Sequence, residues 1–109
     1  EVSEAAERDL DLIFHHLAGS FGDFGMDRPA AAEQALGRVL SIRDNIDRLG
    51  VEPRRGEAHS DLLPGLRHLT IDKAVYWFVV DEVRKSIQVL AIFYGGQEHR
   101  RHMLRRLLQ

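Results

Sequence analysis

Two consecutive segments of the chain are apolar on both faces, and they constrain its fold more than any other feature. Residues Ala74–Val80 and Ser86–Tyr94 are rich in β-branched and aromatic side chains, which is typical of strands. In the first, one face would carry Val75, Trp77 and Val79, and the other Tyr76, Phe78 and Val80. In the second, Ile87, Val89, Ala91 and Phe93 would lie opposite Leu90, Ile92 and Tyr94. An antiparallel sheet with one face in water alternates apolar and polar residues, so both faces of this sheet must be covered.

A third β-rich segment, Leu66–Ile71, precedes these two. Because the connections at residues 72–73 and 81–85 are short, we predict an antiparallel meander of three strands. Residues 51–65 hold two prolines and two glycines and are predicted to be irregular.

The N-terminal half has the three- and four-residue apolar spacing of amphipathic helices. The first helix is predicted over residues 4–18 with Ser3 as its N-cap, followed by a loop at Gly19–Arg28. The second starts near Asp27–Pro29 and ends at Leu49. Together they predict an antiparallel helical hairpin, which can cover one face of the sheet.

The second sheet face needs another cover. Residues 97–108 are predicted to form a helix with Met103 and Leu107 on its apolar side, and this tail is one candidate. A second copy or a different protein are the others. Each large apolar side chain left in water forgoes about 1.5–3 kcal/mol, so a bare face is disfavoured. We expect a partner to contribute to the cover, with or without the tail.

The length of 109 residues fits one domain, spanning residues 1–109. The chain has no cysteine, which excludes disulfide scaffolds, iron–sulfur clusters and a cysteine nucleophile. No apolar run approaches the roughly 18 residues of a membrane span, and no signal peptide is visible. We therefore expect a cytoplasmic protein with no membrane partner.

Charge is distributed unevenly along the sequence. The first 50 residues carry five arginines and ten acidic residues, whereas residues 51–109 carry ten basic and seven acidic residues. Much of the positive charge lies in the tail, at Arg100, Arg101, Arg105 and Arg106. These arginines are either solvated helix faces or a surface for an anionic partner.

Few residues suggest catalysis. His99 and His102 could share a helix face, but Arg100 and Arg101 lie between them, and we expect no metal site and no cofactor. A metal-free acid/base site could use arginines and histidines of the basic half, yet the sequence does not bring them together. Its candidates are Arg54, Arg55, Arg67, His68 and His99.

Several motifs, in this order, resemble the RelE/ParE superfamily, the toxins of type II toxin–antitoxin modules. They cover nearly the whole chain and are most similar to the ParE-like branch, the plasmid-stabilisation toxins. The motifs are A-E-R-D-L at residues 6–10, P-R-R-G at 53–56, P-G-L-R-H-L at 64–69, and V-L-A-I-F-Y-G-G-Q-E-H at 89–99, followed by R-R-H-M-L-R-R-L.

The resemblance implies an α+β fold: a helical hairpin packed on a three- to four-stranded antiparallel sheet, with a short C-terminal helix. It implies a non-enzymatic toxin that inhibits DNA gyrase, and so DNA replication. A cognate antitoxin, expected to be a ribbon–helix–helix ParD-like protein, would neutralise it in a hetero-oligomer, and DNA would be contacted only through that antitoxin. We expect Arg67, His99, Arg100 and Arg101 to form the target-binding basic surface, and Trp77, Phe78 and Tyr94 to bind the antitoxin.

Two departures from the family pattern keep alternatives open. The family usually opens with a β-strand, of which only Glu1–Ser3 could be the end. The first alternative function is that of a RelE-like, ribosome-dependent mRNA endonuclease, in which Arg67 would stabilise the phosphate and His99 would transfer a proton. This chain lacks the lysine-rich second helix and the C-terminal tyrosine of such enzymes. The other alternative is that the chain is a structural domain that dimerises through its sheet.

Overall fold

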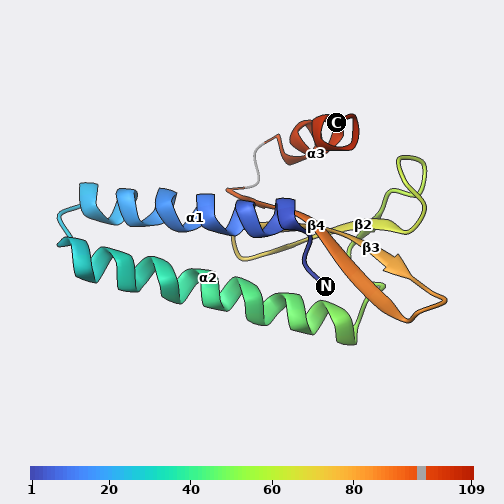
Figure 1. Cartoon of the computed structure of the whole chain (residues 1–109), viewed down its shortest axis with the longest axis horizontal. Coiled ribbons are helices and arrows are strands. Elements are labelled where there is room, and N and C mark those ends of the chain that lie inside the picture. Colours follow the sequence, from blue (N-terminus) through green and yellow to red (C-terminus); the bar gives the residue numbers. More distant parts are fainter. Residues whose placement is uncertain (96–97) are drawn as a thin grey trace.

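Two long antiparallel helices lie along one side of a twisted four-stranded sheet in the computed structural model of the chain, which describes residues 1–95 and 98–109 (Figure 1). The elements are α1 (Glu4–Asp23), α2 (Arg28–Val51), β1 (Glu57–Ala58), β2 (Leu66–Ile71), β3 (Ala74–Asp81), β4 (Ser86–Tyr94) and α3 (His99–Leu107). The strands are hydrogen-bonded in the order β1-β2-β3-β4, with every pair antiparallel. The predicted α+β architecture is confirmed.

The hairpin begins where its capping residues predict. The Ser3 hydroxyl accepts a hydrogen bond from the Ala6 amide at 3.1 Å, and the Asp27 carboxylate accepts one from the Ala30 amide at 2.9 Å. The loop predicted at residues 19–28 is wrong for its first half, because α1 continues to Asp23. A helical glycine costs only about 1 kcal/mol relative to alanine, and Phe21 packs against the core from this last turn.

The sheet has one strand more than the meander predicted from sequence. Residues 51–65 were expected to be irregular, but Glu57 and Ala58 pair with His68 and Arg67 of β2. Gly56 makes this pairing possible: its φ is +84°, and a Cβ there would lie 2.2 Å from the His68 carbonyl oxygen. A two-residue strand gives too short a pattern to detect by periodicity.

The first residues of the chain run beside β4. Val2 forms a parallel bridge with Val89, the Ser3 amide donates to the Val89 carbonyl at 2.9 Å, and the Val89 amide donates to the Glu1 carbonyl at 2.8 Å. Glu1–Ser3 therefore pairs with the sheet as the end of a strand would, which is the role that the sequence left open for it.

Both faces of the sheet are apolar and covered, as the strand pattern required. The α1–α2 hairpin covers the face that carries Tyr76 and Phe78. The tail helix α3 covers the other, where Met103 packs with Trp77 and Leu66. All five of these side chains are fully buried. The tail helix therefore provides at least part of the cover of the second sheet face. Gln97, the predicted first residue of that helix, lies outside the described residues.

The predicted assignment of the β4 side chains to the two sheet faces is wrong in part. The register shifts between Trp77 and Phe78, which pair with Ala91 and Val89, so Leu90 is an extra residue in β4. As a consequence Val89 packs on the hairpin face, together with Ile87, whereas Ala91 packs under α3. The four residues predicted to share one face are divided by this bulge.

No helix in the described part of the chain is both long enough and apolar enough to cross a bilayer.

Candidate functional site: the basic tail helix and a histidine cluster

The tail helix brings together three of the four residues predicted to form a basic surface. His99, Arg100 and Arg101 form the first turn of α3, and the side chains of Arg100 and Arg101 are 59% and 64% exposed. Arg100 pairs with Glu57 of β1, and Arg101 lies 3.4 Å from the carboxylate of Glu98.

Arg67 does not join this surface. It lies in β2 opposite Phe78, and neighbouring residues of a strand point to opposite faces, so Arg67 is on the hairpin face and His68 on the α3 face. The Arg67 guanidinium donates to the Gly56 carbonyl at 3.2 Å. The fold therefore does not place all four residues on a single basic surface.

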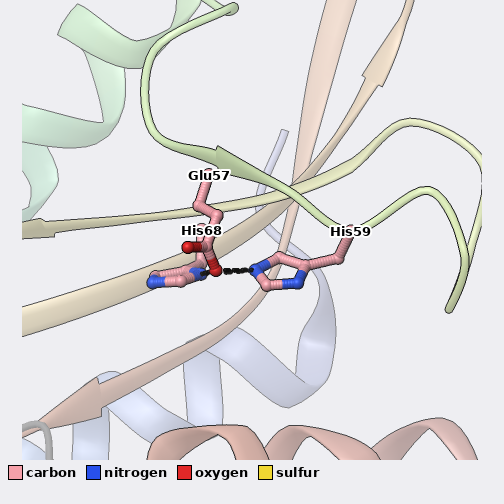
Figure 2. Close-up of side chains that lie close together, drawn as sticks. All are labelled: Glu57, His59 and His68. Carbon is pink, nitrogen blue, oxygen red and sulfur yellow. Dashed lines mark hydrogen bonds and ion pairs between the residues drawn. The ribbon is translucent and has the colours of Figure 1, made fainter.

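Beneath α3 lies a cluster of histidines that the sequence did not assemble. Strand pairing places Glu57 opposite His68, and His68 opposite Trp77, in a row across three strands. His59 follows Glu57 by two residues and so points to the same face (Figure 2). The two-residue spacing of Glu57 and His59 is the sequence signal that could have indicated this cluster. It places both side chains on one face only if β1 is a strand.

The three side chains of the histidine cluster, Glu57, His59 and His68, converge on one point. His59 Nε2 lies 2.7 Å from His68 Nδ1, and Glu57 Oε2 lies 3.2 Å from His59 Nε2 and 3.9 Å from His68 Nδ1. The two imidazole rings stack at a centroid distance of 4.9 Å, and each lies 4.8 Å from the Trp77 ring. The His59 side chain is only 7% exposed.

The surroundings favour neutral imidazoles beside α3. Burial lowers the pKa of His68 below its ordinary value, and the neighbouring His99 and His59 lower it further, against the opposing effect of Glu57. Burial and the Arg100 guanidinium lower the pKa of His99 in the same direction. Both rings are therefore uncharged at neutral pH, with a lone pair available on each.

The residues predicted to bind an antitoxin have unequal access to a partner. Trp77 and Phe78 are fully buried, under α3 and under the hairpin respectively. A direct contact with either would require the covering helix to move. Tyr94 is partly exposed, and its hydroxyl accepts a hydrogen bond from Arg38 at 3.3 Å.

Tyr94 also lines a groove of about 390 Å³ between α1, β4 and α3. Leu12 and Phe93 give the groove apolar walls, and His102 and Arg106 flank it from α3. The Leu12 side chain is 69% exposed, so the apolar wall is open to a partner.

No protein-family profile matches the chain, and no curated protein matches it. Solved structures do match, among them a chain of the "Chromosomal ParDE TA system from P. aeruginosa". The two chains are 26% identical, the match covers 85% of this chain and 90% of that one, and the TM-score is 0.63. The similarity therefore extends over nearly the whole α+β fold.

Proposed function

We propose that this chain, whose resemblance to ParE-like members of the RelE/ParE superfamily is confirmed by its fold, is the toxin of a type II toxin–antitoxin module that inhibits DNA gyrase. The observation that carries the proposal is the similarity to a ParDE chain over 85% of this one. The toxin would act in the cytoplasm, without a catalytic step.

The basic first turn of α3 supports a role in target binding. Arg100 and Arg101 are exposed beside one another, so an approaching anionic surface would meet two guanidinium groups. The Arg100 pair with Glu57 and the Arg101 pair with Glu98 are exposed, and pairs of this kind contribute about 0–1 kcal/mol, so a target can replace them at little cost. Arg67, on the other sheet face, would make a separate contact.

The groove between α1, β4 and α3 supports an antitoxin contact. Its apolar walls suit an extended or helical segment with a few large apolar side chains. Tyr94 would contact such a segment directly, whereas Trp77 and Phe78 would do so only after α3 or the hairpin is displaced. A neighbouring reading frame that encodes a ribbon–helix–helix, ParD-like protein would identify this partner.

A RelE-like ribonuclease is the second candidate, favoured by the neutral histidines beside Arg100. The pair named for it, Arg67 and His99, lies on opposite sheet faces, so the two residues do not flank a common phosphate. Such an enzyme would have to use the histidine cluster instead.

Two assays with the purified chain distinguish these functions. In the first, DNA gyrase supercoils relaxed plasmid in the presence of increasing toxin; in the second, a translation extract is examined for mRNA cut at codon positions. We expect supercoiling to be inhibited and mRNA to remain intact. Codon-phased cleavage with normal supercoiling would establish the ribonuclease instead.

A further inference from the structure

We propose that Glu57, His59 and His68 form a binding site for one divalent transition-metal ion of the zinc type, although the sequence led us to expect no metal site and brought only His99 and His102 into consideration for one. The three donor atoms all lie within 4.8 Å of one another. They come from β1, from the residue that follows it, and from β2, so the site depends on the β1–β2 pairing.

The donor atoms are close to the spacing that such an ion requires. Zinc binds imidazole nitrogen and carboxylate oxygen at about 2.0–2.2 Å, and a tetrahedral arrangement then places neighbouring donors about 3.3 Å apart. The observed separations of 2.7, 3.2 and 3.9 Å lie on either side of this value. The largest departure from it is about 0.6 Å.

The hydrogen bonding of this cluster is compatible with a change to metal binding. At 2.7 Å only one hydrogen fits between His59 Nε2 and His68 Nδ1, so one of these nitrogens presents a lone pair to the other. Glu57 Oε2 is a further acceptor at the same point. One N–H and two lone pairs therefore meet at this point. If the ring hydrogens of both histidines sit on their other nitrogens, all three atoms present lone pairs to a cation.

The type of ion follows from the donors. Imidazole favours zinc, copper, nickel or iron, whereas magnesium and calcium prefer oxygen ligands. Among the described residues no further histidine, aspartate or glutamate places a donor atom within the same 4.8 Å, so water would take the remaining position. The tilted contacts of both rings with the buried Trp77 restrict their orientation before the ion arrives.

Arg100 opposes metal binding, which provides a sharp test. Its guanidinium pairs with the same Glu57 oxygen that faces the histidines, so it competes with the ion and adds positive charge beside it. The Arg100 side chain is mostly exposed and can turn into solvent. Arg100→Gln should therefore raise the metal affinity, whereas loss of a ligand should lower it.

The experiment is a titration of the purified, metal-free full chain with Co²⁺, followed by visible absorption, together with melting curves in Zn²⁺. We expect one equivalent to bind, a melting temperature that rises with Zn²⁺, and at least about tenfold weaker binding in His59→Gln and Glu57→Gln. Glu57 is exposed, so Glu57→Gln should keep the metal-free fold, which circular dichroism would verify. His102→Gln, at an exposed histidine of α3, is the matched control and should bind as the unaltered chain does.

Three outcomes would overturn the site. They are the absence of saturable Co²⁺ binding, equal loss in His102→Gln and His59→Gln, and an Arg100→Gln variant that binds no more tightly than the unaltered chain. None of these measurements uses growth arrest or gyrase, so failure of the metal site leaves the proposed function untouched, and the reverse also holds.

Discussion

Arg106 in α3 holds Asp9 in α1 through two parallel hydrogen bonds, 2.6 Å from Nη1 to Oδ2 and 2.8 Å from Nη2 to Oδ1. Asp9 is only 6% exposed, and its Oδ2 also accepts the Ile92 amide of β4 at 2.9 Å. The Arg106 Nη1 donates as well to the Leu90 carbonyl at 3.2 Å. One carboxylate and one guanidinium thus join the hairpin, the last strand and the tail helix.

Removing Arg106 should destabilise the protein strongly. Arg106→Ala leaves the buried Asp9 carboxylate without its cation, and breaking such a pair costs about 3–5 kcal/mol. Because the Arg106 side chain is 28% exposed, we expect about 3 kcal/mol, the lower end of that range. Urea denaturation measures this loss. The control is Arg105→Ala, which removes an exposed arginine one residue away and should change stability by less than about 0.5 kcal/mol. Equal midpoints for the two variants would show that the pair does not hold α3.

Two glycine substitutions should have opposite effects on the stability of the protein. Gly56→Ala places a methyl group against the His68 carbonyl at a positive φ, so we expect a loss of about 1–3 kcal/mol and a displaced β1. Gly37→Ala lies in the interior of α2 with open space around it, and should stabilise by about 0.5–1 kcal/mol. Thermal and urea unfolding of the pair measure both effects. A stable Gly56→Ala variant would mean that β1 does not need this close approach.

Tyr76 should make stability fall at high pH. Burial raises the pKa of its hydroxyl, partly offset by the hydrogen bond from Asn45 and reinforced by Asp72. Above the ordinary tyrosine pKa of about 10, the unfolded chain releases a proton that the folded chain still holds, so unfolding becomes easier as pH rises. Below about pH 10 the contribution of Tyr76 to the free energy of unfolding is fully present.

Urea unfolding of the unaltered chain and of Tyr76→Phe, between pH 8 and about 11, measures this linkage. The phenylalanine variant should lose about 1 kcal/mol at pH 8, where its missing hydrogen bond matters, and should show a shallower decline above pH 10. Parallel curves for the two proteins would contradict a raised pKa at Tyr76.

The basic turn of α3 should matter for the target and not for the fold. We expect Arg100→Ala/Arg101→Ala to require about tenfold more protein for the same inhibition of gyrase, because two steering charges are lost. Its melting temperature should stay near that of the unaltered chain, since both ion pairs are exposed.

The matched control for that variant is Arg54→Ala/Arg84→Ala, which removes two exposed arginines with similarly weak ion pairs elsewhere in the basic half. It should inhibit gyrase as well as the unaltered chain. If both double variants lose potency equally, net charge alone would explain the effect and α3 would have no special part in it.

The sequence predicts the elements whose patterns repeat and misses those that depend on a single residue. Ser3, Asp27 and the spacing of apolar residues locate both hairpin helices, and three of the four strands follow from residue type and turns. The bulge at Leu90 has no signature in the apolar run, so the faces of β4 cannot be assigned without it.

The candidate site was harder to predict because it is built by tertiary contacts. The histidine cluster depends on a two-residue strand that only the Gly56 turn and the pairing with β2 define. Nothing in the pattern of the first helix distinguishes Asp9, because its pairing with Arg106 spans 97 positions of sequence. Contacts over such separations leave no local pattern.

The most direct test of the central claim is growth after induction of this chain alone and together with the antitoxin gene expected beside it. The account predicts that induction of the chain alone arrests growth and that co-expression of the neighbouring gene restores it. Undiminished growth in cells that accumulate the folded chain would contradict the assignment as a toxin.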